Sequence, residues 1–548
     1  MSADTNSLRG ADIVARSLER LGCKQVFTLS GNHIMSIFDA ALEAKLDLVH
    51  VRHEAAAVHM ADAWGRLTGQ AGIAMVTGGP GHANAVGALY TALGAESPMV
   101  LLSGHAATWE LGRGGFQEIR QADMAAPVTK ASWTATSAAT LGRDIGEAIR
   151  IATSGRPGPV HLSLPSDLLE ERVESNAIVW PNGRGASPAP ALTTPVADAV
   201  LAAIAAAARP IIFAPPQLSN MSGRALLGRL EAALRAPAVI LESPRGIADA
   251  TLGAFSDLVR RADLLVLLGK ALDFTTRWAS GPAFDPAVQV IAIDPEAALV
   301  DRAAKEMNGR LVLGGIADIR AAAETLIVRS ATAKTRNDRW LTEARAALDN
   351  RPAAWATVAS KTSGRLHPAE VFRALRPYVE RDPDTVLICD GGEFAQWGQS
   401  MLPVRRRLIN GVAGSIGSSL SFALSARLLE PRAPVFAVLG DGTIGFHLSE
   451  FETAVRRKLP FVAILGNDAL WNAESQIQLR EYGKDRMHGC ELMPARYDLV
   501  VAALGGHGEF VENAADLPGA IERALESHKP ACINIMIESI AAPVIRLG

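Results

Sequence analysis

Two polar tips follow two neighbouring apolar runs in the last third of the chain. Asp441 comes directly after "PVFAVLG", and Asn467 and Asp468 come directly after "PFVAILG". Short apolar runs bounded by glycine and proline predict buried parallel strands, and "HLSEFETAVRRKL" between them has the apolar spacing of a helix. In such a strand–helix–strand unit both tips lie at the carboxyl ends of neighbouring strands, where open α/β sheets bind ligands. Oxygen donors there suit a hard cation such as Mg²⁺, and the adjacent helix N-terminus suits a phosphate.

Two segments of the first third carry further candidates. "VRHEAAAVHMADAWGRLTG" places Glu54 at the start of a helix rich in small residues, where a carboxylate either does chemistry or only complements the helix dipole. "VTGGPGHANAV" ends a strand in a glycine-rich turn, which is either a structural tight turn or a floor on which the backbone approaches a ligand closely. A Gly-Asp-Gly tripeptide alone is more often a simple turn. The combination of the segments, rather than one of them, indicates a binding site.

The elements that must position these residues alternate along the whole chain. At 548 residues the chain is too long for one core, and two composition breaks divide it into roughly equal thirds. The first is a linker rich in Pro, Gly, Ser and Ala over residues 174–195, and the second is a charged, partly helical stretch from residue 329. Each third alternates short apolar strands with amphipathic helices, which predicts three doubly wound parallel α/β domains. We place their bounds at 1–175, 192–335 and 366–548.

Composition and charge exclude several classes of protein. The net charge of −3 gives no reason to expect nucleic acid or an anionic membrane as a partner, and 49% apolar residues with 20% charged residues are typical of a globular enzyme. The N-terminus has no apolar signal region, and the most apolar stretch, "AVLAAIAAAARPIIFAPP", is typical of a helix followed by a strand rather than a membrane span. The four cysteines have no CxxC spacing. We therefore expect a cytoplasmic protein without a zinc site.

Taken together, these segments resemble one known family over nearly the whole chain. "RHEAAA", "ADAWGRLTG", "GGPGHANA", "FQE", "APVTK", "GRPGPVHLSLPSD", "GSIG" and the Gly-Asp-Gly to Asn-Asp segment are similar to those of the thiamine diphosphate-dependent enzymes. This family includes acetolactate synthase, benzaldehyde lyase, 2-hydroxyacyl-CoA lyase and pyruvate decarboxylase. The resemblance implies a pyrimidine-binding, a central and a diphosphate-binding domain, with thiamine diphosphate and Mg²⁺ as cofactors. It also implies a homo-oligomer, with a dimer as the least functional unit and a tetramer as the common form, because family members share each site between subunits.

The resemblance gives several residues a role toward the organic part of the cofactor. In the family a carboxylic acid hydrogen-bonds to N1′ of the aminopyrimidine, so that the 4′-amino group can take the proton on thiazolium C2, and Glu54 matches that acid. A carboxyl group buried among alanines favours its neutral form, which this role requires. A bulky apolar side chain keeps the cofactor bent, and Ile416 of "GSIG" matches it, the alternative being that Ile416 belongs only to the core. Pro80, Asn84 and Gly414 match further cofactor contacts.

The resemblance also assigns the metal and diphosphate contacts. Asp441 matches the first metal ligand, and the backbone carbonyl of Leu470 matches the third protein contact. The second ligand of the family is the latter Asn of an Asn-Asn pair, and Asp468 stands in that place here. This departure adds a negative charge beside the diphosphate and leaves open whether Asn467 or Asp468 binds the ion. The remaining residues matched to the diphosphate are Gly392, Glu393, Phe394, Gly442 and Thr443.

Three residues bear on the substrate. His33 in "LSGNHIMSIFDA" matches an active-site histidine of benzaldehyde lyase and suits a proton shuttle to substrate oxygen, the alternative being structural packing. Gln117 of "FQE" matches a glutamine that lines the site, and Trp471 is expected near the cofactor and the substrate. His82 either faces the substrate or caps a helix, and its role stays open.

The resemblance implies an enzyme that makes or breaks a carbon–carbon bond next to a carbonyl group, through ylide and enamine intermediates. The substrates are 2-keto acids, aldehydes or 2-hydroxy ketones, and acetolactate synthase-like and benzaldehyde lyase-like reactions remain close alternatives. A 2-hydroxyacyl-CoA lyase or oxalyl-CoA decarboxylase-like enzyme is a further alternative, which the short tail after the last strand disfavours. A catalytically silent homologue has only the departure at Asp468 in its support. Arg156 and "GKALDF" match places where relatives touch ADP or FAD, but neither is expected here because the first strand of the central domain lacks a glycine cluster.

Overall fold

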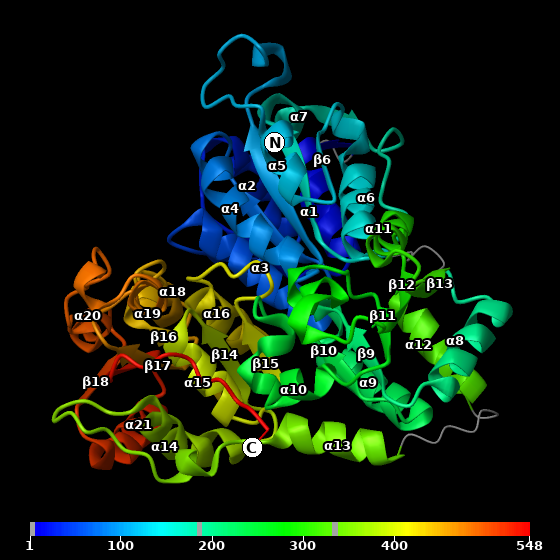
Figure 1. Cartoon of the computed structure of the whole chain (residues 1–548). Helices are drawn as coiled ribbons and strands as arrows, with labels where there is room; N and C mark the ends of the chain where they lie inside the picture. The colour runs from blue at the N-terminus through cyan, green and yellow to red at the C-terminus, as the bar shows by residue number, and fades with distance from the viewer. Residues whose placement is uncertain (1–5, 184–188, 331–337, 548) are drawn as a thin grey trace. The chain divides into compact units, whose positions relative to one another are not determined.

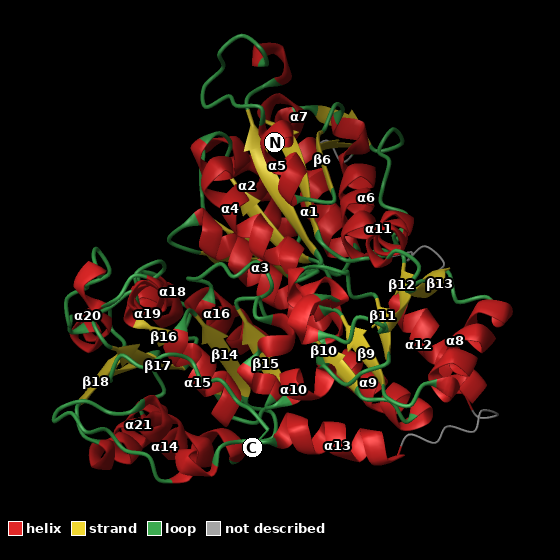
Figure 2. Ribbon diagram, in the orientation of Figure 1, coloured by secondary structure: helices red, strands yellow, loops and turns green. Residues whose placement is uncertain are grey.

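The structure is a computed structural model that describes residues 6–183, 189–330 and 338–547 (Figure 1). The chain divides into two compact units, Met1–Pro188 and Ala189–Gly548. The first unit holds one six-stranded parallel sheet, and the second holds a five-stranded and a six-stranded parallel sheet. Helices accompany the strands of each sheet (Figure 2), which confirms the predicted fold class of three doubly wound α/β sheets. The predicted domain bounds stay a prediction. The predicted linker and the charged stretch include residues 184–188 and 331–337, which lie outside the described residues.

The sheet of the first unit has the strand order β3-β2-β4-β5-β7-β6. Its strands are β2 (Gln25–Thr28), β3 (Asp47–His50), β4 (Gly72–Val76), β5 (Met99–His105), β6 (Ala131–Thr134) and β7 (Pro159–Pro165). The helices are α1 (Gly10–Arg20), α2 (Met35–Glu43), α3 (Glu54–Thr68), α4 (Pro80–Gly94), α5 (Gln121–Ala125), α6 (Leu141–Thr153) and α7 (Ser166–Glu170). A short antiparallel pair, β1 (Ser7–Arg9) and β8 (Arg172–Glu174), joins the two ends of the unit. Every residue of β4, β5 and β7 is buried, which explains why these central strands are continuous apolar runs.

The five-stranded sheet of the second unit has the order β10-β9-β11-β12-β13. Its strands are β9 (Pro210–Ala214), β10 (Ala238–Ile240), β11 (Leu264–Leu268), β12 (Gln289–Asp294) and β13 (Leu311–Ile316). The helices around it are α8 (Thr194–Ala206), α9 (Met221–Leu234), α10 (Phe255–Val259), α11 (Ala297–Met307), α12 (Ile319–Ser330) and α13 (Asp338–Asp349). Ile211 and Phe213 of β9 belong to one apolar cluster, and Ile212 and Ala214 to another. Successive residues of a strand point to opposite faces, so this sheet is covered on both sides.

The second sheet of this unit has the order β15-β14-β16-β17-β19-β18. Its strands are β14 (Val386–Asp390), β15 (Arg406–Ile409), β16 (Val435–Gly440), β17 (Val462–Asn467), β18 (His507–Val511) and β19 (Ala531–Met536). The helices are α14 (Pro368–Glu380), α15 (Glu393–Met401), α16 (Ser419–Leu429), α17 (Asp441–Ile444), α18 (Glu450–Arg456), α19 (Asn472–Glu481), α20 (Tyr497–Ala503) and α21 (Leu517–Glu526). β16 and β17 are parallel neighbours with α18 between them in sequence, which confirms the predicted strand–helix–strand unit.

The two sheets of the second unit are tied by a buried ion pair. Glu242 lies two residues after the end of β10. Its carboxylate lies 2.6 Å from Arg407 of β15 and 3.0 Å from Arg224 of α9. Although burial opposes the charged form, the two guanidinium groups hold the pKa of Glu242 well below its usual range. This network helps explain why two predicted thirds form one compact unit.

No helix in the described part of the chain is long and apolar enough to cross a membrane.

Candidate active site

Reversals of strand order mark the ligand-binding edge of an open parallel sheet. In the first unit the order reverses between β2 and β4, and in the last sheet it reverses between β14 and β16. Loops that leave the carboxyl ends of such strand pairs in opposite directions form a crevice. The segment after β2 carries His33, and the turn after β4 leads to Pro80, whereas Gly392 and Asp441 follow β14 and β16. The sequence-predicted residues thus gather at one edge of each of these two sheets.

Glu54 and Asn84 form a hydrogen-bonded pair in the first unit. Glu54 is the first residue of α3 and is only 8% exposed, and its Oε2 accepts a hydrogen bond of 3.0 Å from Nδ2 of Asn84 on α4. His53 caps the helix, because its Nδ1 accepts from the backbone N–H of Ala55. A methyl group placed on Gly81 would lie 3.4 Å from Oε1 of Glu54, so the backbone of α4 runs close to the carboxyl group. The carboxyl group is thus held between two helix N-termini, with one oxygen toward a glycine.

His33 lies at the same edge of the sheet. It is buried in the single-turn helix that follows β2, and its Nδ1 lies 3.1 Å from the hydroxyl of Thr77, the residue after β4. Its ring stacks on Phe116 with 6.0 Å between centroids. Burial lowers the pKa of His33, although the nearby Glu110 and a backbone hydrogen bond at Phe116 oppose the shift. A neutral imidazole at this position can take a proton, and the imidazolium that results can return it.

Gln117 approaches the glycine-rich turn after β4. It has a left-handed backbone, with φ of 57°, and a methyl group on Gly79 would lie 2.4 Å from its carbonyl oxygen. The turn itself is held by Gln121, whose Oε1 accepts from the N–H of Gly79 at 2.9 Å. Gln121 also donates to the carbonyl of Gly104 and lies 2.9 Å from the hydroxyl of Ser163. Sequence reasoning did not identify Gln121 or Thr77, since no motif marks a residue whose partners come from other strands.

His82, whose role the sequence left open, points into the interior of the first unit. It is fully buried, its Nδ1 lies 2.9 Å from the hydroxyl of Ser103, and its ring lies 4.5 Å from that of His161. Burial lowers the pKa of His82 to about 4. Its neutral ring therefore packs between α4 and the two central strands β5 and β7.

Three loops come together at the carboxyl edge of the last sheet. A methyl group on Gly442 would lie 2.7 Å from the ring of Trp471, which therefore covers the start of α17. A methyl group on Gly391 would lie 2.3 Å from the hydroxyl of Thr443, and one on Gly392 would lie 3.0 Å from Ala473. A side chain at any of these three glycines would fill the space between the loops, which we call the backbone cradle. The loops after β14, β16 and β17 thus form a backbone-lined surface next to Asp441.

Asp441 and Asp468 form a buried pair of carboxyl groups at this edge. They are 2% and 6% exposed, and they interact directly. Burial raises the pKa of both groups, and the charge of Asp441 raises the pKa of Asp468 further. Oδ2 of Asp441 is buried and has no hydrogen-bond partner among the described residues. Two acidic groups held together in this way fit a divalent cation, which would supply the missing partner and the missing charge.

The neighbouring Asn467 is engaged elsewhere. Its Nδ2 donates to the carbonyl of Ala495 and to Oδ1 of Asn534 on β19, each at 3.1 Å, and its Oδ1 accepts from the N–H of Ala469. This geometry favours Asp468 over Asn467 as the second ligand. The described residues contain no group of three or more His, Cys, Asp and Glu side chains that could hold a metal ion. The expected set is consistent with that finding, because it has two carboxylates and the backbone carbonyl of Leu470.

The other predicted contacts in the second unit lie around the same loops. The carboxylate of Glu393 accepts from the N–H of Ala542 and lies 3.5 Å from Arg245, so it faces the C-terminal tail. The ring of Phe394 packs in the core, which leaves the backbone of these residues as the expected diphosphate contact. Ile416 is half-buried and lies outside the buried core, and the nearby Gly414 has φ of 70°. This partial exposure favours a ligand-facing side chain over a core residue.

A cavity of about 600 Å³ also opens at this edge, lined by Thr362, Arg365, Asp468, Ala469, Leu470, Glu491, Leu492, Glu538, Ser539 and Ile540.

The acidic pair predicts how stability depends on pH without metal. Both folded-state pKa values lie above the ordinary value for Asp, at about 6 for Asp441 and about 8 for Asp468. The pair then binds more protons in the folded protein than in the unfolded chain, so its contribution to stability is full below about pH 4 and is lost as the pH rises through these values. In an Asp468→Asn variant the second charge is absent, so the fall between about pH 5 and about pH 8 becomes smaller. Urea unfolding at a series of pH values in the presence of EDTA measures this fall in stability. Equal pH slopes in the variant and the wild type would contradict the pairing, and added Mg²⁺ should flatten the slope of the wild type.

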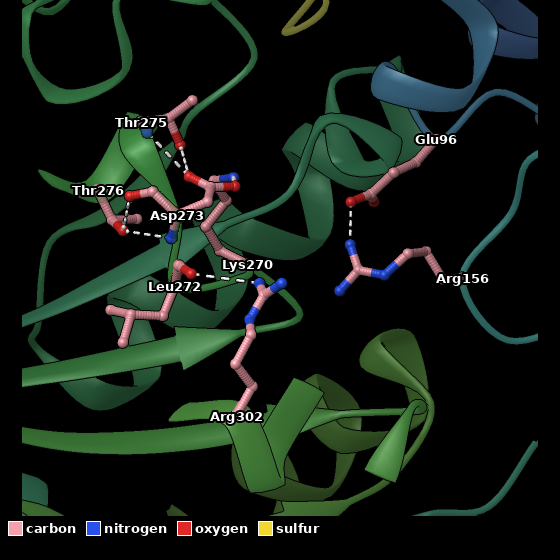
Figure 3. A network of polar contacts seen from close by, with 8 residues as sticks. All are labelled: Glu96, Arg156, Lys270, Leu272, Asp273, Thr275, Thr276 and Arg302. Atoms are coloured by element: carbon pink, nitrogen blue, oxygen red, sulfur yellow. Dashed lines mark hydrogen bonds and ion pairs between the residues drawn. The ribbon is translucent and has the colours of Figure 1, made fainter. Parts of the chain in front are cut away.

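The segments matched to ADP and FAD contacts bond to groups of the chain itself (Figure 3). In the second unit the ammonium group of Lys270 lies 2.7 Å from Oδ2 of Asp273, and Arg302 donates to a backbone carbonyl of the same turn at 3.2 Å. In the first unit Arg156 pairs with Glu96. The charges of these segments therefore have partners within the protein. That FAD and ADP are not bound stays a prediction.

Comparison with known proteins identifies the family. Residues 8–124 match the family described as "Thiamine pyrophosphate enzyme, N-terminal TPP binding domain", and residues 390–535 match "Thiamine pyrophosphate enzyme, C-terminal TPP binding domain". A probable acetolactate synthase of Mycobacterium bovis is 32% identical over an alignment 563 positions long, which covers 99% of each chain. A 2-hydroxyacyl-CoA lyase 2 of Caenorhabditis elegans is 29% identical and is matched over 96% of this chain and 89% of its own. A catabolic acetolactate synthase of Raoultella terrigena is 28% identical over 98% of this chain and 96% of its own.

The two matched regions contain most of the strands of the two sheets at whose edges the predicted residues gather. The N-terminal match contains Glu54, His33 and Gln117, and the C-terminal match contains Asp441 and Asp468. The near-complete alignment with the acetolactate synthase extends this likeness over the sheet between them. The chain belongs to the thiamine pyrophosphate enzyme family and is a thiamine diphosphate-dependent carboligase or lyase.

Proposed function

We propose that the enzyme cleaves, and in reverse forms, the carbon–carbon bond between the carbonyl carbon and the hydroxyl-bearing carbon of a 2-hydroxy ketone. The observation that carries this choice is His33, a buried imidazole at the strand reversal of the first sheet, hydrogen-bonded to Thr77 and stacked on Phe116. Cleavage requires that the substrate hydroxyl lose its proton, and ligation requires that the new alkoxide gain one. The neutral imidazole of His33 can take the hydroxyl proton in cleavage, and the imidazolium formed in this way can return a proton to the alkoxide in ligation.

The residues around Glu54 would serve the organic part of the cofactor. Thiamine diphosphate, when bound, supplies the electron sink for the bond that is made or broken. Glu54 would hold a proton at N1′ of the aminopyrimidine, and its hydrogen bond to Asn84 keeps the carboxyl group in place. Ile416 would support the bent shape of the cofactor from below, and Pro80 and Gly414 would contact it.

The acidic pair and the backbone cradle would hold the diphosphate through Mg²⁺. Asp441, Asp468 and the carbonyl oxygen of Leu470 would bind the ion, since hard oxygen donors are what Mg²⁺ prefers. The backbone from Gly392 to Phe394, with Gly442 and Thr443, would bind phosphate oxygens, which the N-terminus of α15 favours. The ring of Trp471 covers this cradle at Gly442.

A second candidate is the condensation of two 2-keto acids, as an acetolactate synthase performs. The observation in its favour is the 32% identity to the mycobacterial relative over nearly the whole chain. A third is cleavage of a 2-hydroxyacyl-CoA, favoured by relatives of that name at 29% identity. All three use the same cofactor residues and differ in the substrate that His33 and Gln117 would contact. For each of them we propose a homo-oligomer with a dimer as its least functional unit.

His33 is the residue whose replacement separates substrate chemistry from cofactor chemistry. A His33→Ala variant should lose about a hundredfold in kcat/KM for a 2-hydroxy ketone, because removal of a general acid–base group typically costs that much or more. The affinity for thiamine diphosphate should stay unchanged. Steady-state kinetics with benzoin and a titration of the cofactor measure both quantities. Unchanged kcat/KM would remove His33 from the mechanism, and a Thr77→Ser variant, which keeps the hydroxyl partner, serves as the matched control.

The substrate class is tested by incubating the protein with thiamine diphosphate and Mg²⁺ and, separately, with benzoin, pyruvate and a 2-hydroxyacyl-CoA. Mass spectrometry identifies the products. Aldehyde from benzoin with pyruvate untouched is the result that the proposal predicts. Acetolactate from pyruvate alone would establish the second candidate, and turnover of the CoA ester alone would establish the third.

A further inference from the structure

The peptide groups next to Ile416 are held by two buried side chains from other elements. The carboxylate of Asp390, the last residue of β14, accepts hydrogen bonds from the N–H groups of Gly417 and Ser419, at 3.0 and 2.7 Å. On the other side, Nδ1 of His447 lies 2.7 Å from the carbonyl oxygen of Gly417. A carbonyl oxygen only accepts, so His447 donates this hydrogen bond from Nδ1. Gly417 is thus fixed through its N–H and through its C=O.

The segment before Gly417 needs such support. Gly411, Gly414 and Gly417 all have positive φ, at 78°, 70° and 102°. Glycines in this region leave the backbone many alternatives in the absence of other constraints. The side chain of Ile416 is half-buried and does not belong to the core, so its own packing does not fix the loop.

The burial of the two holding groups makes their contacts strong. Asp390 is fully buried and His447 is 6% exposed. Burial raises the pKa of Asp390 to about 6 although several N–H and O–H donors oppose the shift, so the carboxyl group is still mostly ionised at neutral pH. Hydrogen bonds between a carboxylate and backbone N–H groups in a buried setting are among the stronger ones, and the start of α16 adds a favourable dipole.

The same contacts connect the loop to the segment that carries Asp441. His447 and Phe446 lie a few residues after Asp441, and a methyl group on Gly417 would lie 2.6 Å from Phe446. The ring of Phe446 in turn makes an edge-on contact with Trp471, with 6.5 Å between centroids. The glycine at position 417 is therefore packed against the segment that follows the metal ligand.

We propose that Asp390 and His447 act as a clamp on Gly417 that sets the position of Ile416, and are positioning residues for the bent cofactor. This inference rests on the proposed role of Ile416. Neither residue is assigned a contact with the cofactor or the substrate. They act through the backbone, and their loss should slow activation of the cofactor more than it weakens binding of the cofactor.

The test follows the exchange of the C2 proton of bound thiamine diphosphate in heavy water, stopped by acid and read by NMR, in the Mg²⁺-loaded protein without substrate. His447→Phe keeps the ring but removes the donor, and it should slow exchange about tenfold. His447→Asn keeps an N–H at the δ position, and it should restore exchange to near the wild-type rate. The cofactor affinity, measured by calorimetry, and the unfolding temperature should change little in both variants.

The Asp390 variants supply the second arm. Asp390→Ala should slow exchange about tenfold, whereas Asp390→Asn, which keeps an oxygen acceptor, should stay near the wild-type rate. Ser418→Ala removes only a hydroxyl contact of 3.4 Å to Asp390 and serves as the matched control. If Asp390→Ala does not fold, the pair of His447 variants decides.

The outcomes separate the clamp from the role on which it rests. If Ile416→Ala slows exchange while His447→Phe and Asp390→Ala exchange at the wild-type rate, the clamp is wrong and the role of Ile416 stands. If Ile416→Ala exchanges like the wild type, the proposed role of Ile416 is wrong, and the clamp inference falls with it. Slow exchange in His447→Phe that His447→Asn does not restore would also overturn the inference, because the donor would then not be what matters.

Discussion

A Glu54→Gln variant will turn over its substrate about a hundredfold or more slowly than the wild type while still binding thiamine diphosphate. Glutamine has nearly the same size and can keep the contact with Asn84, so the fold of α3 is unaffected. What the amide lacks is a carboxyl proton to hold at the aminopyrimidine. The loss should therefore appear in kcat at saturating cofactor, rather than in the unfolding temperature.

Two variants serve as controls for this prediction. Glu43→Gln makes the same change at the exposed end of α2 and should have wild-type activity. Asn84→Ala removes the hydrogen bond of 3.0 Å to Glu54 without removing the acid, and its loss should be smaller. Full turnover by Glu54→Gln at saturating cofactor would show that Glu54 only complements the dipole of its helix.

An Asp441→Ala variant should lose Mg²⁺-dependent binding of thiamine diphosphate. Loss of an outer-shell partner already costs roughly 10- to 100-fold in metal affinity, and loss of a ligand should exceed that. Asp441 is buried beside Asp468, and its Oδ2 has no hydrogen-bond partner among the described residues, so this oxygen is available to the ion. Asp468→Asn should bind better than Asp441→Ala, since an amide oxygen remains as a ligand.

Calorimetric titration of thiamine diphosphate at fixed Mg²⁺ measures this effect. Asp485→Ala, at an exposed position of the same unit, is the matched control and should bind like the wild type. Tight binding by Asp441→Ala, or binding by the wild type that EDTA does not weaken, would contradict the proposed metal site.

Most of the strands that the sequence predicted are buried on both faces. "DLLVLLG" and "PFVAILG" are continuous apolar runs because β11 and β17 lie inside their sheets. The strands that the sequence analysis did not identify are edge strands such as β3, with the sequence DLVH, and β18, with the sequence HGEFV, which are only partly buried. Their mixed composition does not differ from that of a loop, and only pairing with a neighbour makes them strands.

The candidate site shows a similar division. Asp441 and Asp468 were predicted to lie together because each follows an apolar run. Asp390 also follows an apolar run, "TVLIC", so the same pattern identifies it as a residue at this edge of the sheet. The preference for Asp468 over Asn467 as the proposed ligand rests on the partner strand, since Asn467 is hydrogen-bonded to Asn534 of β19. The pairing of β17 with β19 is not encoded in a local pattern. Thr77 could not be predicted for the same reason, because its contact with His33 joins segments far apart in sequence.

The most direct test of the account measures the exchange of the C2 proton of thiamine diphosphate bound to the wild type and to Glu54→Gln, with Mg²⁺ and without substrate. This readout does not depend on which substrate the enzyme uses. We predict exchange at least about a hundredfold faster on the wild-type protein than in free cofactor, and loss of most of that acceleration in Glu54→Gln. Exchange on the wild type no faster than in free cofactor, with the cofactor demonstrably bound, would contradict the account.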